Sequence, residues 1–323
     1  MPSVSVAIPV LDGGDRFRAL LAALATQDVP RIELVVCDSG SRDGSDRIAE
    51  RAGARVLRID RRAFGHGRTR NLLMRETTGD VVAFLTQDAV PLGPGWLRAL
   101  TAPFADEGIA LTCGPYRPIP GARVATAREL EATFAAMADP PGATTVYRPA
   151  DLPRPLHPVP ATFHTDANGA LRRAAWEQVP FRDVRYAEDH VLAIELLRAG
   201  WSRAFVPAAA VEHSHDYPFG EAFRRLFDEF RALHEVYGFR PRARPREVLG
   251  GIRRRTAGDR AWARARGLDG APLDRATLAS LLHHSQRAAA LVAGTRAEDL
   301  PRPVRRWCSR DGIADVAPLR LDR

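Results

Sequence analysis

The chain has 323 residues, of which 45% are hydrophobic, 27% charged and 7% aromatic, a globular composition that excludes collagen, low-complexity disorder and a small disulfide scaffold. The formal net charge is +8 and every basic residue is Arg, which excludes a P-loop or a catalytic lysine and favours an anionic partner. No apolar stretch approaches the roughly 20 residues that span a bilayer, and the sequence does not begin with a secretory leader, so we expect a cytoplasmic protein.

The first third of the chain alternates strand and helix patterns. Strands are predicted at 4–10, 32–37, 56–59 and 80–85, and helices at 17–25, 46–52 and 69–77, with Asp15 as the cap of the first helix. This spacing predicts βαβ units in an α/β fold with a mostly parallel, Rossmann-like sheet flanked by helices. In such sheets, ligands bind at the carboxyl ends of the strands.

The rest of the chain is more varied. Helices are predicted at 96–104, 128–137 and 190–199, a strand at 109–113, an edge strand at 170–172, and short extended pieces at 204–206 and 209–213. Residues 139–160 hold seven prolines and are predicted to be irregular, either as a loop beside the site or as a plain linker. We expect a domain at 1–218, with halves at about 1–115 and 116–218, and an Arg-rich helical C-terminal region at 219–323.

Acidic residues follow three of the predicted strands. Asp12, Asp38 and Asp88 are each explained individually by turn or cap formation, but together they are expected to converge on one edge of the sheet. A carboxylate at such an edge binds a base or sugar hydroxyl, or holds a hard cation between phosphates. Asp88 ends a buried apolar run and is the candidate for the cation.

Other candidate residues lie later in the chain or on the third helix. Glu188 and Asp189 open a helix, where they serve as caps or as a general base for an acceptor hydroxyl. His213 and His215 lie at i, i+2 on an extended segment, so one of them is a candidate metal ligand while the other packs. A glycine-rich turn carries Arg68 and Arg70, which suit phosphate, although a plain turn explains it too. The predicted site also includes Pro9, Ser39 and Gln87.

Several segments, in their order and spacing, resemble the inverting family 2 glycosyltransferases of GT-A fold. The first two resemble the nucleotide loops of that family: Ser5-Val-Ala-Ile-Pro-Val-Leu-Asp12 and Val35-Val-Cys-Asp-Ser-Gly-Ser-Arg-Asp-Gly-Ser45. Phe84-Leu-Thr-Gln-Asp-Ala89 resembles its D-x-D region, with Thr86 in place of the first Asp, and Ala187-Glu-Asp189 resembles the segment of its catalytic base. Thr86-Gln-Asp-Ala89, Ser39 and His213-Ser-His-Asp-Tyr217 are most similar to bacterial rhamnosyltransferases.

This resemblance, which covers about residues 3–217, implies a nucleotide-sugar transferase that works by inversion in cell-surface glycan or glycolipid synthesis. The donor is linked to dTDP, UDP or GDP, and the acceptor is a glycan or a lipid-linked glycan. Asp189 is the implied base, ahead of Glu188. The implied cation is Mg²⁺ or Mn²⁺ on Asp88 with His215 or His213. The implied nucleotide-sugar contacts are Pro9, Asp12, Asp38, Ser39, Arg68, Arg70 and Gln87.

Three other functions remain open from the sequence. A nucleotidyltransferase would also use Asp88, but this sequence lacks the glycine- and Lys-rich loop of those enzymes. A catalytically inactive relative would bind only a glycan or a partner. Nucleic-acid binding is not expected, because the aromatic residues of the C-terminal region have core-like helical spacing. The Arg-rich region instead suggests a helical cap, or a peripheral contact with the inner face of the cell membrane.

Overall fold

The structure is a computed structural model that describes residues 2–316, 319 and 321, so the predicted region 219–323 ends partly outside the described residues. The chain divides into two compact units. The first contains residues 1–117, 133–154 and 159–213, and the second contains 118–132, 155–158 and 214–323. We describe each unit separately.

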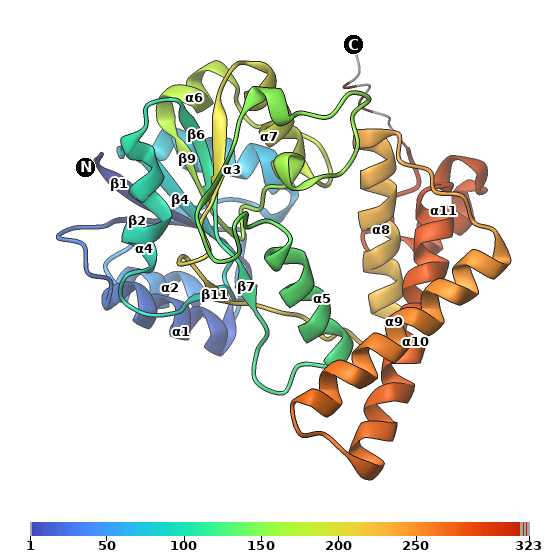
Figure 1. Cartoon of the computed structure of the whole chain (residues 1–323). Coiled ribbons are helices and arrows are strands. Elements are labelled where there is room, and N and C mark those ends of the chain that lie inside the picture. Colours follow the sequence, from blue (N-terminus) through green and yellow to red (C-terminus); the bar gives the residue numbers. More distant parts are fainter. Residues whose placement is uncertain (1, 317–318, 320, 322–323) are drawn as a thin grey trace. The chain divides into compact units, whose positions relative to one another are not determined.

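The first unit is built on an eight-stranded sheet with the order β3-β2-β1-β4-β9-β6-β10-β8 (Figure 1). The strands of this sheet are β1 (Val4–Val10), β2 (Glu33–Asp38), β3 (Arg55–Arg58), β4 (Val81–Leu85), β6 (Ile109–Cys113), β8 (Thr145–Tyr147), β9 (Asn168–Arg172) and β10 (Ser202–Phe205). Neighbouring strands run parallel except at β9 and β8. A second, three-stranded sheet contains β5 (Val90–Pro91), β11 (Val211–Glu212) and β7 (Tyr116–Arg117).

Helices cover both faces of the large sheet because its central strands are apolar on both sides. In β4, Val81, Ala83 and Leu85 belong to one core cluster and Val82 and Phe84 to the other. In the first cluster, one face of the sheet is covered by the helices α1 (Gly14–Ala25), α2 (Ser45–Arg51) and α4 (Trp96–Thr101). The second cluster packs α3 (His66–Glu76), α6 (Arg173–Gln178) and α7 (Glu188–Arg198) on the other. Four short 3₁₀ turns complete the unit: η1 (Arg61–Ala63), η2 (Ala102–Ala105), η3 (Pro149–Asp151) and η4 (Pro160–Thr162).

The predicted α/β class and mostly parallel sheet are confirmed, and β1 has the predicted bounds. Three local predictions are wrong, the third of them at β9. Gly13, not Asp15, occupies the N-cap of α1, because the turn places Asp15 inside the first helical turn. Residues 139–160 are not wholly irregular: between prolines, Thr145–Tyr147 forms β8 at the edge of the sheet, where the missing N–H groups of neighbouring prolines are tolerated.

The segment predicted as an edge strand is the central, antiparallel strand β9, between β4 and β6. Its first residue, Asn168, is buried but satisfied, because it accepts from Trp96 Nε1 at 2.9 Å and donates to the Ala209 carbonyl at 2.8 Å. At Gly169 a Cβ would lie 2.5 Å from the Thr165 carbonyl oxygen, so only glycine fits there. The sequence Asn-Gly-Ala-Leu-Arg of β9 carries no pattern that indicates its strand neighbours, which explains the error.

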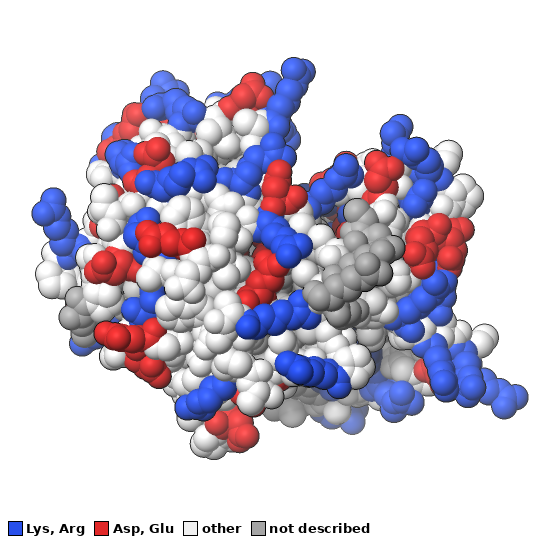
Figure 2. Space-filling view, turned by 90° about the horizontal axis from the view of Figure 1, so that it is seen from above, with Lys and Arg blue, Asp and Glu red and all other residues white. Residues whose placement is uncertain are grey.

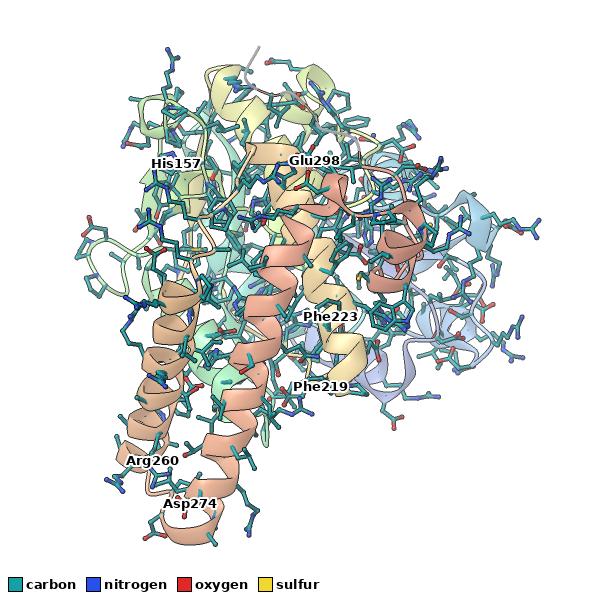
Figure 3. The ribbon with its side chains drawn as sticks, turned by 90° about the vertical axis from the view of Figure 1, so that its right-hand side faces the viewer. His157, Phe219, Phe223, Arg260, Asp274 and Glu298 are labelled. Atoms are coloured by element: carbon teal, nitrogen blue, oxygen red, sulfur yellow. The ribbon has the colours of Figure 1, made fainter. Side chains whose placement is uncertain are left out.

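The second unit is helical. It contains most of α5 (Val124–Ala135) and the elements α8 (Phe219–Tyr237), α9 (Pro245–Ala265), α10 (Gly270–Gly294), η5 (Ala297–Asp299) and α11 (Arg302–Cys308). The helix α10 packs against both α8 and α9. Figure 3 shows α9 and α10 as an antiparallel pair, with Arg260 and Asp274 facing each other near their connecting turn. Among the described residues, no helix is long and apolar enough to cross a membrane.

Candidate active site

The predicted acidic residues lie at one edge of the large sheet. Strands β1, β2 and β4 are parallel, so Asp12, Asp38 and Asp88 follow them at the same edge. Strand β9 runs the other way, with Asn168 opposite Leu85, so the loop before β9 reaches this edge too. That loop contributes Asp166, a residue the sequence analysis did not single out.

Of the two carboxylate oxygens of Asp38, one is hydrogen-bonded to described residues and the other is not. Oδ1 accepts from the backbone N–H groups of Gly40 at 2.8 Å and Ser41 at 2.9 Å. Oδ2 is buried and has no hydrogen-bond partner among the described residues. The neighbouring Ser39 is buried as well and donates its hydroxyl to the Val10 carbonyl at 3.1 Å. An unpaired buried carboxylate oxygen is costly, so Oδ2 is suited to accept from a ligand.

Asp12 and Gln87 tie the loops of this edge together. Asp12 has a positive φ of 49°, and its Oδ1 accepts from the backbone N–H of Arg42 at 2.7 Å in the loop after β2. The Gln87 amide makes two bonds to Leu11, accepting from its N–H at 2.7 Å and donating to its carbonyl at 3.0 Å. Pro9 lies beside Cys37 in the register of β1 and β2. Gln87 thus fixes the chain around Leu11, and its contact with a nucleotide stays a prediction.

Asp88 and His213 form a carboxylate–imidazole pair, with 3.4 Å between Asp88 Oδ1 and His213 Nδ1. Arg16 on α1 positions this pair, because it donates to the Asp88 carbonyl at 3.1 Å and to the Glu212 carbonyl at 2.8 Å. Carboxylate oxygen and imidazole nitrogen are a donor set that Mn²⁺ accepts, so these two residues fit a divalent cation. His215 belongs to the second unit, where its ring stacks on Tyr217.

A buried charge cluster lies at the N-termini of α3 and α7. Arg70 is buried and forms ion pairs with Glu188 and, at 3.2 Å, with Asp166. His164 lies 3.3 Å from Asp166 on its other side. The sequence analysis expected Arg70 to bind phosphate, but its guanidinium is engaged by these carboxylates. Arg68 is half-exposed and lies 3.3 Å from Asp183.

Asp189 is the half-buried third carboxylate of this cluster, and its ligand atom lies within 4.8 Å of those of Asp166 and Glu188. Burial, followed by the charges of Glu188 and Asp166, raises the pKa of Asp189 to about 8, against the lowering effect of Arg70. A carboxylate with such a raised pKa is matched to accept a proton near neutral pH. Its position at the start of α7 agrees with the predicted helix.

Tyr116 links the pair and the cluster. Its ring contacts the His213 ring at a centroid distance of 4.8 Å, and its hydroxyl bonds the Thr165 hydroxyl, next to Asp166. Burial raises the pKa of Tyr116, and the charge of Asp189 adds to this. Asp88 and Asp189 are therefore connected through a short series of contacts at one edge of the sheet. The sequence gave no periodic or motif signal for Tyr116, His164 or Arg16.

Residues 5–178 match the family model described as Glycosyl transferase family 2. Over 70% of both chains, the sequence is 30% identical to the O-antigen chain rhamnosyltransferase RfbN of Salmonella typhimurium. It is 28% identical to the O-antigen chain rhamnosyltransferase WbaN of Salmonella anatum, over 71% of both chains.

Among solved structures, the chain resembles the mannosyltransferase PcManGT from Pyrobaculum calidifontis in complex with GDP-Man and Mn²⁺. The TM-score is 0.60 and the identity 19%, over 91% of this chain and 86% of that one. This likeness concerns the fold, which is of the GT-A type.

Proposed function

This chain belongs to glycosyl transferase family 2. We propose that it moves a deoxyhexose, with rhamnose as the leading candidate, from a nucleoside diphosphate to an acceptor hydroxyl with inversion. The two Salmonella relatives are named as O-antigen rhamnosyltransferases, which supports both the sugar and a role in cell-surface polysaccharide synthesis. The observation that carries the proposal is the placement of Asp189 on the same edge of the sheet as Asp38 and Asp88.

The nucleoside is proposed to bind at the ends of β1 and β2. The free Oδ2 of Asp38 accepts from the base or the ribose, while Ser39 and the backbone near Pro9 shape the loop. Asp12 and Gln87 keep the two loops in register. We propose that residues 1–115 hold the donor and 116–218 the acceptor, as the sequence analysis expected.

The diphosphate is proposed to lie at Asp88 and His213, and a metal contact of His215 stays a prediction. A divalent cation held there, Mn²⁺ or Mg²⁺, supplies positive charge against the negative charge that develops on the leaving diphosphate. Because the guanidinium of Arg70 forms ion pairs with buried carboxylates, Arg68 is the better phosphate partner of the two arginines. The Thr86 hydroxyl, at the place of the first Asp in the D-x-D region that this segment resembles, provides no charge.

Asp189 is proposed as the general base, ahead of Glu188. Its carboxylate takes the proton of the acceptor hydroxyl as the new bond from that oxygen to the anomeric carbon forms. The bond from the anomeric carbon to the phosphate oxygen breaks on the opposite face, so the configuration inverts. Glu188 is bound to Arg70 and keeps the pKa of Asp189 high.

The alternatives weighed from the sequence are now weaker. Family membership makes the chain a glycosyltransferase and disfavours a nucleotidyltransferase. On the face in Figure 2, basic and acidic side chains are interspersed among the described residues, without the continuous basic stripe that nucleic acid requires.

A donor screen tests the proposed function. The full chain is mixed with dTDP-, UDP- and GDP-sugars and lipid-linked or free glycans, with Mn²⁺, Mg²⁺ or a chelator. We expect one nucleoside diphosphate to raise the melting temperature only with a cation, and the product to carry the inverted anomeric configuration by NMR. A nucleotide concentration of 100 times Kd stabilises the folded chain against unfolding by about 2.7 kcal/mol.

Two variants sharpen this screen. Asp38→Asn keeps the acceptor for Gly40 and Ser41 but replaces the free oxygen, so nucleotide should bind about tenfold more weakly, about 1.4 kcal/mol. Asp46→Asn on α2, an acidic residue bound to Arg58, is the matched control and should bind normally. Equal binding by both variants, or retention of the full thermal shift in chelator, would argue against this arrangement of donor and cation.

A lipid-linked acceptor would favour a peripheral membrane contact, and we propose α10 for it. Leu278, Leu281 and Leu282 are exposed on one helix face, and Arg275 lies one turn before Leu278. The full chain should float with vesicles containing anionic lipid, and exchange of the three leucines for glutamine should abolish flotation. Flotation unchanged by that exchange would place the contact elsewhere.

A further inference from the structure

The second unit contains a group of histidine and acidic side chains that the proposed transfer reaction does not use. Glu129 lies on α5, Asp259 on α9, and His283 and His284 on α10. The ligand atoms of Glu129, His283 and His284 lie within 4.8 Å of one another. All four residues belong to the second unit, and three helices meet at them.

Asp259 holds the imidazole ring of His284 in place. His284 is 2% exposed, and its Nε2 lies 2.7 Å from Oδ2 of the fully buried Asp259. The other oxygen of Asp259, Oδ1, accepts from Arg128 NH1 at 2.9 Å. With Nε2 held by Asp259, Nδ1 is the nitrogen of His284 that faces the rest of the group.

This second nitrogen of His284 faces a carboxylate oxygen of Glu129. His284 Nδ1 lies 3.7 Å from Glu129 Oε1, and neither buried atom has a hydrogen-bond partner among the described residues. The other oxygen of Glu129 lies 3.3 Å from His283 Nε2. A buried imidazole nitrogen and a buried carboxylate oxygen that face each other without a hydrogen bond are a donor pair that a divalent cation takes up.

We propose that Glu129, His283 and His284 bind a divalent transition-metal ion of the Zn²⁺ class, with Asp259 holding His284 as an outer partner. Ligands about 2.0–2.1 Å from Zn²⁺ in a tetrahedron lie roughly 3.4 Å apart, close to the two distances above. A ligating histidine that gives its other N–H to a carboxylate is the usual arrangement of such sites. The ion would join α5, α9 and α10, a structural function separate from the proposed transfer reaction.

Two arginines compete for Glu129. Arg287 Nε and Arg255 NH1 lie 3.6 and 3.7 Å from Glu129 Oε1, which is longer than a hydrogen bond. The Arg255 side chain is 58% exposed and is free to extend into water. Removing its charge should therefore strengthen metal binding, whereas an ion-pair cluster without metal predicts no change in metal affinity.

The test uses the full chain with Asp88→Asn, which separates this group from the proposed donor cation. Metal-stripped protein is titrated with Zn²⁺, followed by calorimetry and melting temperature, and with Co²⁺, followed by its visible absorption. We expect one ion per chain and a higher melting temperature. His283→Gln should abolish binding, and Asp259→Asn should weaken it about 10–100-fold.

His157→Gln is the matched control, because His157 is an exposed histidine of the same unit, labelled in Figure 3, and should bind normally. Arg255→Gln should bind Zn²⁺ more tightly, a gain that misfolding cannot produce. No uptake by the parent protein, or equal uptake by His283→Gln and the parent, would overturn the proposal and leave an ion-pair cluster. Donor binding and transfer do not enter these readouts, so failure here leaves the proposed function intact.

Discussion

Asp189→Asn should lose sugar transfer by roughly 10²–10⁴-fold while still binding the nucleoside diphosphate. The amide occupies the same volume but cannot take the proton of the acceptor hydroxyl. Since the Asp189 carboxylate lies within a cluster that holds no nucleotide contact in our proposal, the donor affinity should not change. Single-turnover transfer rates and calorimetric titration with the nucleotide measure the two effects separately.

The same variant should differ from the parent in stability as a function of pH. The pKa of Asp189 is about 8 in the folded chain and about 4 when unfolded, so between these values the folded state binds more protons. Stability of the parent therefore falls as pH rises through this window. Asp189→Asn has no titrating carboxylate at this position and so avoids this decrease in stability. It should be more stable than the parent at pH 8, but not at pH 4. The parent transfer rate should rise with pH through the folded pKa.

Glu195→Gln is the matched control for Asp189→Asn. Glu195 lies on the same helix, α7, but its carboxylate pairs with Arg182 rather than with the charge cluster. It should transfer sugar at the parent rate. If Asp189→Asn also transferred at that rate, Asp189 would not be the base, and Glu188→Gln would be the next variant to examine.

The positions of strands and their terminal acidic residues were predictable because they depend on local pattern. The strand β1 alternates between two cores, and Asp38 and Asp88 follow apolar runs whose length fits a buried strand. Parallel connection then places these carboxylates at one edge without further information. The helix that begins at Glu188 was predictable for the same reason.

The partners of these residues were not predictable, because they depend on contacts between distant segments. Arg70 and Glu188 are 118 positions apart, and their pairing requires α3 and α7 to lie on the same face of the sheet. Asp166 enters the cluster only because β9 is antiparallel and central. A glycine-rich turn with two arginines suggests phosphate binding, and only the fold shows which arginine is buried among carboxylates.

Arg70→Gln should lower the free energy of unfolding by roughly 3–5 kcal/mol at neutral pH. The substitution leaves the buried carboxylates of Asp166 and Glu188 without the guanidinium that both contact. Arg68→Gln, two residues away on the same helix, removes a half-exposed pair with Asp183 and should cost less than about 1 kcal/mol. Urea unfolding of both variants gives the comparison directly.

The pH dependence separates this electrostatic cost from a loss of packing. The destabilisation by Arg70→Gln should shrink as pH falls toward 4, since without Arg70 the buried Asp166 carboxylate takes up a proton more readily and no longer stays charged and uncompensated. Arg70 also lowers the pKa of Asp189, so the variant should need a higher pH than the parent for transfer. A destabilisation that is equal at pH 4 and pH 8, or equal to that of Arg68→Gln, would mean that Arg70 fills space and does not compensate the buried carboxylates that it contacts.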